Sequence, residues 1–280
     1  MHELLRPFEF EFFRNGLLVA TLAGALCGLV GVYVVLRGMS YIGHGLSHAI
    51  FGGFAASSLL GVNYLLGAGT WGLASALAIG AVTRRRPIGS DAAIGVITTA
   101  SFAIGLVLAD IFHGPRQNFD AALFGSILGV SSADVWGMVA VIVFAVAVVF
   151  FGYRKLLFTT FDPEVAQVSG VNTARIDALL MLVLAVSILA TMQVVGVTLL
   201  AATLVIPPTV ARMLTNSFSS MLVLSTVIGG VCGFVGMNLS YHLDWKTGPT
   251  IVLVGTALFA GVLMLTGSRR LGRVAYIGHV

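Results

Sequence analysis

The feature that most constrains this chain is a succession of apolar runs, each about as long as a bilayer is thick. They cover approximately residues 16–36, 41–61, 68–83, 91–112, 134–153, 175–195, 196–214, 218–240 and 249–267. A helix needs about 20 mostly apolar residues to cross the hydrocarbon core. The third run is short, and the sixth and seventh abut. The sequence therefore predicts an all-α polytopic membrane protein with eight or nine transmembrane helices.

The composition agrees with a chain that lies almost entirely in a membrane. Only 9% of its residues are charged and 58% are hydrophobic, whereas soluble domains carry about 25% charged residues. We expect residues 1–280 to form a single transmembrane domain. The pI of about 9.4 reflects arginines at the membrane edges rather than a surface for nucleic acid. Cys27 and Cys232 lie in apolar runs and are interpreted as packing residues.

The basic residues indicate how the chain is oriented. The ends of the spans that would share one side carry eleven of them: Arg37, Arg84, Arg85, Arg86, Arg154, Lys155, Arg175, Arg212, Arg269, Arg270 and Arg273. The opposite side carries the other four, which are Arg6, Arg14, Arg116 and Lys246. Positive residues accumulate in cytoplasmic loops, so the first side is expected to be cytoplasmic. With nine spans, the N-terminus would then lie outside.

Two histidines, His44 and His48, stand out within a span that is otherwise apolar and rich in glycine. Their spacing of four places both imidazoles on one face of a helix. Ionisable groups inside a membrane are costly and mark ion pathways. The pair is therefore a candidate metal site. The alternative is a structural role, in which both imidazoles bond to Ser40, Ser47 or backbone carbonyls.

Other polar residues lie near the outer ends of spans or inside one. We consider these further candidates for a metal path: Asp110, His113, Asp120, Gln193, Asn238, His242 and Asp244. An exposed loop would explain the first three equally well.

The connection between the fifth and sixth spans contains the signals of a short helix outside the membrane. Asp162 suits the N-cap, Pro163 the first helical position and Glu164 the positive end of the helix dipole. Gly170 is a natural stop. Such a helix is either a plain connector or the element that docks a permease onto an ATPase subunit.

Two prolines in tandem, Pro207 and Pro208, interrupt the seventh run. Each removes a backbone hydrogen bond and kinks a helix. The kink is either static or a hinge for alternating access.

Landmarks along most of the chain, roughly residues 15–267, resemble the permease subunit of the ABC importers for zinc, manganese and iron. They are GVYVVLRGMSYIGHGLSHAIFGG (31–53), FGSILGVSSADV (124–135), FDPEVAQVSGVN (161–172), VVGVTLLAATLVIPPTVARML (194–214) and SYHLDWKTGPTIVL (240–253). Two positions depart from the family pattern. His44 stands where an aspartate is common, and Lys246 where a proline is common.

The resemblance implies a type II importer-like permease bundle in a bacterial plasma membrane. Its partners would be a second permease in a homodimer, two cytoplasmic ATPase subunits and an extracytoplasmic metal-binding protein. Segment 162–170 would be the coupling helix, and segment 119–130 a short gating helix at the outer mouth. His48 matches the family residue, whereas His44 corresponds by position only. No cofactor would be bound permanently, and ATP would act through the partner.

We therefore expect a permease that imports a divalent transition metal, either Mn²⁺ or Zn²⁺ or Fe²⁺. Imidazole suits zinc and iron, while carboxylate suits manganese, so two histidines shift the balance toward zinc. The chain has no G-x-x-x-x-G-K-[ST] or HExxH motif, which argues against an enzyme. One alternative is an ABC permease for a metal chelate. The other is a secondary transporter, which would need a mid-span carboxylate that the runs lack.

Overall fold

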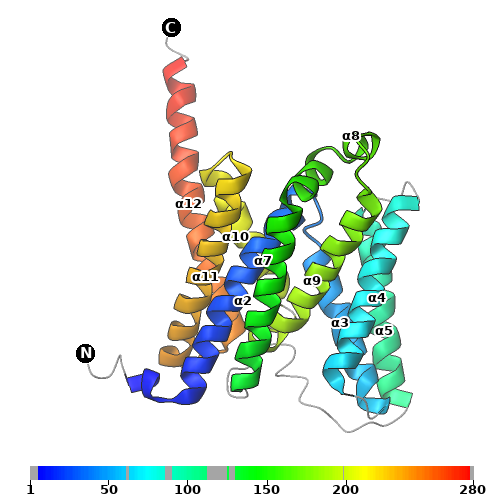
Figure 1. The fold of residues 1–280 in the computed structure, drawn as a ribbon. Helices are drawn as coiled ribbons and strands as arrows, with labels where there is room; N and C mark the ends of the chain where they lie inside the picture. Colours follow the sequence, from blue (N-terminus) through cyan, green and yellow to red (C-terminus); the bar gives the residue numbers. More distant parts are fainter. Residues whose placement is uncertain are drawn as a thin grey trace.

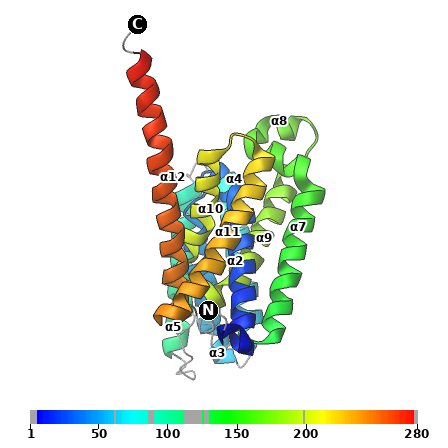
Figure 2. The same ribbon diagram turned by 90° about the vertical axis from the view of Figure 1, so that its left-hand side faces the viewer.

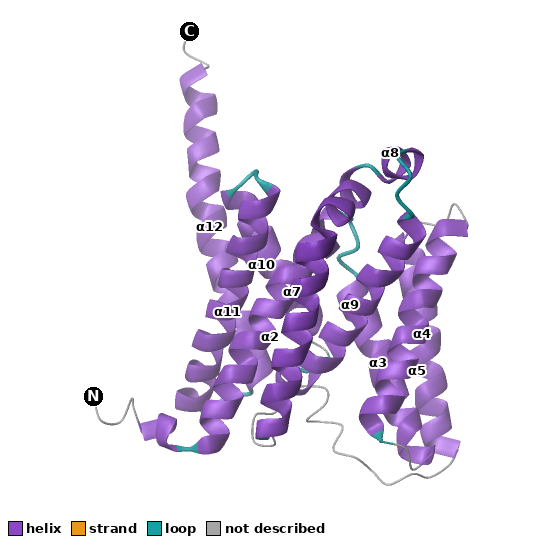
Figure 3. Cartoon of the chain, in the orientation of Figure 1, coloured by secondary structure: helices purple, strands orange, loops and turns teal. Residues whose placement is uncertain are grey.

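The computed structural model describes residues 6–60, 63–85, 90–111, 125, 130–197 and 199–277. Within these ranges the chain is helical, with short turns between helices (Figure 3). The bundle consists of α2 (Glu11–Leu36), α3 (Ile42–Leu60), α4 (Tyr64–Arg85), α5 (Ser90–Ile111), α7 (Ser132–Phe161), α9 (Thr173–Val195), α10 (Leu200–Leu214), α11 (Phe218–Leu243) and α12 (Thr247–Ile277). Two short helices, η1 (Arg6–Glu9) and α8 (Pro163–Val168), lie at its ends.

Each predicted apolar run coincides with one of these helices, and the all-helical prediction is confirmed. Among the described residues, seven helices are long and apolar enough to span a membrane, and α10 is a shorter apolar helix. Two details of the prediction were wrong. The third run is not short, because α4 has 22 residues. The seventh helix begins at Leu200 rather than at 196, because Gly196 adopts a φ of +83° and ends α9.

Helix α2 is the centre of the bundle, because 72% of its most apolar stretch is buried. It packs against α7, α9, α10 and α11. Its closest approach is to α11, where Gly24 lies against the backbone of Gly229, and Gly28 against that of Ser225. The Ser225 hydroxyl donates to the Gly28 carbonyl at 2.6 Å. Small residues permit this approach.

The helices alternate in direction, so that the predicted basic edge is gathered at one end (Figures 1 and 2). The turn after α2, the end of α7, the start of α9 and the end of α10 all lie there, with Arg37, Arg154, Arg175 and Arg212. Helix α8 projects from the same end. The positive-inside rule identifies this end as cytoplasmic, and α2 therefore starts from the outer side.

Most of the segment predicted as an outer gating helix, 119–130, lies outside the described residues. Only Gly125 and Val130 are described. Gly125 has a φ of +76° and lies against the backbone of Val194 at the end of α9. Gly125 thus contacts the last turn of α9.

Candidate metal site and its link to the cytoplasmic face

The two imidazoles predicted to share a helix face do so in the first two turns of α3. The ring centroids of His44 and His48 are 4.5 Å apart, with the ring planes at 71°. His48 also contacts Phe102 of α5, with 5.1 Å between ring centroids. His44 is exposed and His48 is half-buried. The pair therefore opens onto a surface of this chain, where an ion could reach both rings.

Two glycines beside His44 allow α3 to enter between its neighbours. A Cβ at Gly43 would come within 2.8 Å of Leu204 Cδ1 in α10, and one at Gly45 within 2.8 Å of Ile94 Cγ2 in α5. Helix α10 has only 15 residues, about 22 Å at the helical rise, and ends at the cytoplasmic edge. The first turn of α10 therefore lies within the hydrocarbon core, which is about 30 Å thick. The start of α3 packs against α10 and lies in the core as well.

The hydrogen bonds near the pair bear on whether it has only a structural role. Ser47 Oγ lies 2.8 Å from the carbonyl oxygen of His44 and 3.0 Å from that of Val197, which joins α3 to the turn before α10. The serine thus bonds backbone carbonyls rather than imidazoles. Nδ1 of His48 is buried with no hydrogen-bond partner in the described part of the chain. A ring nitrogen can bind a metal only where no hydrogen bond engages it, and Nδ1 of His48 meets this condition.

No cluster of three or more metal-ligating side chains occurs among the described residues. The pair by itself therefore supplies two nitrogen ligands, fewer than the four that tetrahedral structural sites use. Water, or a surface facing the exposed side of His44, would have to complete the coordination. Incomplete coordination suits an ion in transit rather than one held permanently.

The other candidate path residues do not join the pair. The side chains of Asp110 and Gln193, and residues His113 and Asp120 entirely, lie outside what the structure describes. Asn238, His242 and Asp244 lie at the outer end of α11, which is on the opposite side of the bundle from α3 (Figure 1). The Asn238 amide donates to the Phe234 carbonyl at 2.8 Å, and His242 and Asp244 are exposed.

Helix α8 has the caps that its sequence predicted. The Asp162 carboxylate accepts from the Val165 N–H at 3.0 Å, Pro163 opens the helix, and Gly170 follows it with a φ of +82°. The helix stands at the cytoplasmic end, in contact with α7 and α9 (Figure 1). Two of its apolar side chains are poorly covered, since Val165 is 49% exposed and Val168 is 91% exposed. An exposed apolar helix outside the membrane is typical of a docking element.

One polar junction was missed by sequence reasoning. The Arg37 guanidinium, in the turn that leads from α2 to His44, binds Asp177 Oδ1 at 2.6 Å in α9. It also donates to Thr160 Oγ1 at 3.2 Å and to Thr159 Oγ1 at 3.0 Å, both in the last turn of α7. The arginine thus connects both helices that carry α8 with the turn before the histidine pair. The basic residue was visible in the sequence, but its partners are more than 120 residues away.

The tandem prolines lie inside α10, which continues through them. Proline at 208 leaves the Leu204 carbonyl without its helical donor. That carbonyl lies against Gly31 of α2, as does the Pro208 ring. Both prolines are buried, so they occupy the contact between α10 and the central helix.

A multi-spanning bundle with a histidine pair in the first turns of one helix and a capped helix at its basic end is typical of a membrane transport protein. Comparison with known proteins identifies the class. A model of the ABC 3 transport family matches residues 9–266, and the chain belongs to this family. It is a multi-pass permease of a bacterial plasma membrane and part of an ABC importer with other subunits, which confirms the resemblance noted in the sequence.

Individual relatives match over most of their length. The chain is 35% identical over 251 residues to the manganese transport system membrane protein MntC of Listeria monocytogenes, covering 90% of this chain and 89% of that protein. It is 34% identical over 271 residues to the manganese import system permease ScaB of Streptococcus parasanguinis, covering 97% and 96%. A probable iron transport system membrane protein of Haemophilus influenzae is 34% identical, covering 91% and 94%.

Two solved structures share the fold. PsaBC from Streptococcus pneumoniae, in complex with Fab, matches with a TM-score of 0.83 and 31% identity, covering 94% of this chain and 95% of that one. An inward-facing transporter described as of metal-chelate type matches with a TM-score of 0.69 over 89% and 84%, at 14% identity. The second likeness shows the fold alone and does not support the chelate alternative.

Proposed function

We propose that this permease imports a divalent transition metal ion, with Mn²⁺ as the first candidate, and that the ion passes the His44–His48 pair. The observation that carries the proposal is the similarity to permeases named for manganese import, along 90% of the chain or more. The geometry of the pair supports it, because the two imidazoles are adjacent and Nδ1 of His48 has no other described partner.

The choice of metal depends on two opposing considerations. The named relatives favour manganese, with iron as the second named metal. The donor set favours zinc, because imidazole is a borderline ligand and divalent zinc binds such sites more tightly than manganese does. An import pathway needs release as well as binding. We propose that the loose coordination by two nitrogen atoms permits the weaker-binding manganese to pass quickly.

The driving force would be supplied by partners. We propose that two copies of this chain assemble with two cytoplasmic ATPase subunits and receive the ion from an extracytoplasmic binding protein. Helix α8 would be the coupling helix, since it is capped, exposed and cytoplasmic, and carries uncovered apolar side chains. Segment 119–130 would form the outer gate, and Pro207 and Pro208 would mark where α10 bends as the path changes sides. Residues 1–280 would form one domain.

Arg37 supports the coupling proposal. Any displacement of α8 acts on the end of α7 and the start of α9, and Arg37 is bonded to both. The arginine is separated from His44 by only six residues. We propose that this junction carries movement from the ATPase contact to the turn that precedes the metal site.

The test is ATP-driven uptake of Mn²⁺, Zn²⁺ and Fe²⁺ into proteoliposomes that contain the assembled transporter and its binding protein. The wild type is compared with the His44→Ala, His48→Ala double variant, and with His242→Ala at the outer end of α11. We expect manganese uptake that the double variant loses and His242→Ala retains. Equal uptake by the double variant would contradict the path. Uptake of a chelate but of none of the three free ions would favour the chelate alternative.

A further inference from the structure

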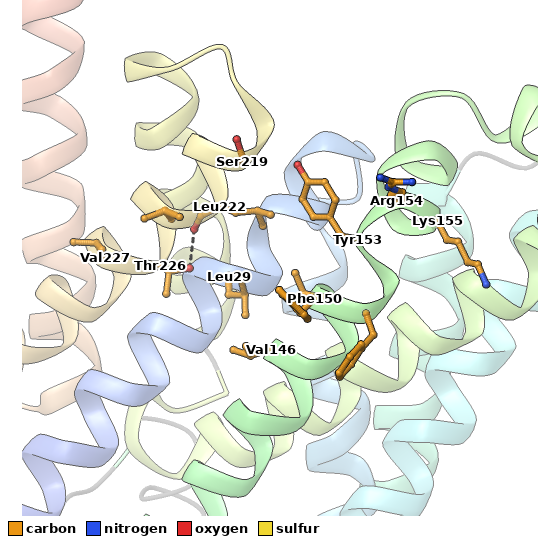
Figure 4. A pocket seen from close by; sticks show the side chains of 13 residues that line it. Leu29, Val146, Phe150, Tyr153, Arg154, Lys155, Ser219, Leu222, Thr226 and Val227 are labelled. Atoms are coloured by element: carbon orange, nitrogen blue, oxygen red, sulfur yellow. Dashed lines mark hydrogen bonds between the residues drawn. The ribbon is translucent and has the colours of Figure 1, made fainter.

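A long groove on the outside of the bundle lies far from the histidine pair. It has a volume of about 880 Å³ and runs between α7 and α11 above α2, as Figure 4 shows. Leu29 is the α2 residue on its floor. One wall presents Val146, Phe150 and Tyr153 of α7, and the other presents Leu222, Val223 and Val227 of α11. The walls are therefore almost entirely apolar.

The packing of α2 explains why the groove exists. Helix α11 packs closely on α2 through the glycine contacts at Gly24 and Gly28. Helix α7 also packs against α2, but it makes little contact with α11. Toward the cytoplasmic end, two aromatic rings meet across the space between α7 and α11. They belong to Tyr153 and Phe218, and their centroids are 5.6 Å apart.

The groove opens toward the surroundings of the bundle rather than into it. Helix α7 is the most apolar of the seven long helices, since its most apolar stretch has a mean hydropathy of 2.7. Only 17% of that stretch is buried. Phe150 is 74% exposed, and Val223 across the groove is 67% exposed. In a membrane protein such a surface contacts lipid tails or another transmembrane protein.

Two positive charges lie at the cytoplasmic end of the groove. Arg154 and Lys155 follow the apolar residues of α7 directly and are among the lining residues, and both are exposed. In Figure 4 the Lys155 side chain extends along the side of α7 that faces away from α11. Neither side chain is in a hydrogen bond or an ion pair within the described part of the chain. From Val146 to Lys155 the helix rises about 14 Å, close to half of the 30 Å hydrocarbon core. The groove is thus about as deep as one leaflet.

We propose that this groove binds an anionic phospholipid of the cytoplasmic leaflet. An acyl chain lies along Leu29, Phe150 and Leu222, and the phosphate group interacts with Arg154 and Lys155. The apolar walls match the tail, and the two unpaired cations at leaflet depth match a negatively charged headgroup. The cytoplasmic leaflet is where anionic lipids and basic residues near the membrane attract one another.

Electron spin resonance of spin-labelled lipids tests the proposal on the assembled transporter in bilayers. The measured quantity is the ratio of motionally restricted phosphatidylglycerol to motionally restricted phosphatidylcholine per permease. We expect a clear preference for phosphatidylglycerol. In the Arg154→Gln, Lys155→Gln variant this ratio should fall about fivefold for each charge removed. In Arg154→Lys most of the preference should remain. Soluble glycerol phosphate should not displace the lipid, because it lacks the tail.

Two further variants separate the groove from general surface charge. Arg212→Gln removes a cytoplasmic charge at the end of α10, outside the groove, and should leave the preference unchanged. Val223→Trp fills the groove from an exposed position and should reduce restricted lipid of both kinds. The proposal is overturned if the wild type shows no preference, or if the double variant keeps it.

The competing occupant is a second copy of this chain. Val223→Cys in the assembled transporter should react with a bilayer-soluble maleimide if lipid fills the groove. Protection of that cysteine in the assembled transporter, together with reaction in the separated permease, would show that protein covers the groove and would reject the lipid site.

Discussion

At the residue scale, the placement of His44 and His48 depends on small neighbours as much as on the imidazoles. Gly43 and Gly45 have no side chains to keep α3 away from α10 and α5. The backbone of α3 can therefore enter the bundle at this point, and the two rings are presented on its remaining face. Phe102 limits the space beside His48, since its ring is 5.1 Å away.

Replacing His48 tests the metal path at its more buried ligand. His48→Ala should abolish ATP-driven manganese uptake while the transporter still assembles, because the site then has a single imidazole. Uptake and assembly are measured on the same preparation, the latter by size-exclusion chromatography with the ATPase subunits. Transport at the wild-type rate would show that the ion takes another route.

Replacing the exposed ligand tests metal preference. His44→Asp exchanges a borderline nitrogen ligand for a hard oxygen ligand, which suits manganese better than zinc. We expect the ratio of manganese to zinc uptake to rise severalfold in competition assays. His44→Ala is the control, since it removes the ligand without offering a carboxylate. An unchanged ratio in His44→Asp would mean that selection occurs elsewhere.

At the scale of elements, the contact between α2 and α11 depends on which glycines face it. Gly229 lies on the backbone of Gly24, whereas a Cβ at the adjacent Gly230 would meet nothing closer than Ala25 Cβ at 3.6 Å. Gly229→Ala should destabilise the permease by about 1–3 kcal/mol through overpacking. Gly230→Ala should be close to neutral. Thermal unfolding in detergent compares the two, and equal midpoints would argue against the close helix contact.

Helix α8 gives a second prediction at this scale. Glu164 is exposed in its first turn, where an acidic side chain interacts favourably with the helix dipole. Glu164→Arg reverses the charge of the surface that we propose contacts the ATPase. ATP hydrolysis should continue while metal uptake falls, and Glu164→Gln should show a smaller effect. Normal uptake per ATP hydrolysed in Glu164→Arg would indicate that α8 is only a connector.

At the scale of the whole molecule, Arg37 joins segments that the chain order keeps far apart. Its side chain is 11% exposed and that of Asp177 is 25% exposed. Hydrogen bonds to charged groups contribute about 1.5–3 kcal/mol each, so Arg37→Gln should lower both stability and coupling. A double-mutant cycle with Asp177→Asn measures the pair, and Arg175→Gln in the first turn of α9 is the control. Additive effects in the cycle would rule out a direct interaction.

The sequence alone was sufficient for the helices, the caps of α8 and the adjacency of the two histidines, while the orientation stays a prediction from the basic residues. These depend on local properties, namely run length, the asymmetry of basic residues, capping chemistry and the spacing of four within a helix. The positions of Asp162, Pro163 and Gly170 determined α8 in this way. The family likeness was also present in local motifs.

Only the tertiary structure decided which distant residues meet. Arg37 finds Thr159, Thr160 and Asp177 because α2, α7 and α9 end together at the cytoplasmic face. The groove above Leu29 exists because α7 and α11 both pack against α2 but make little contact with each other. In a membrane every span is apolar on most faces, so hydrophobicity does not reveal which faces pack together. That choice is made by shape and by the few polar contacts, and these exist only once the helices have assembled.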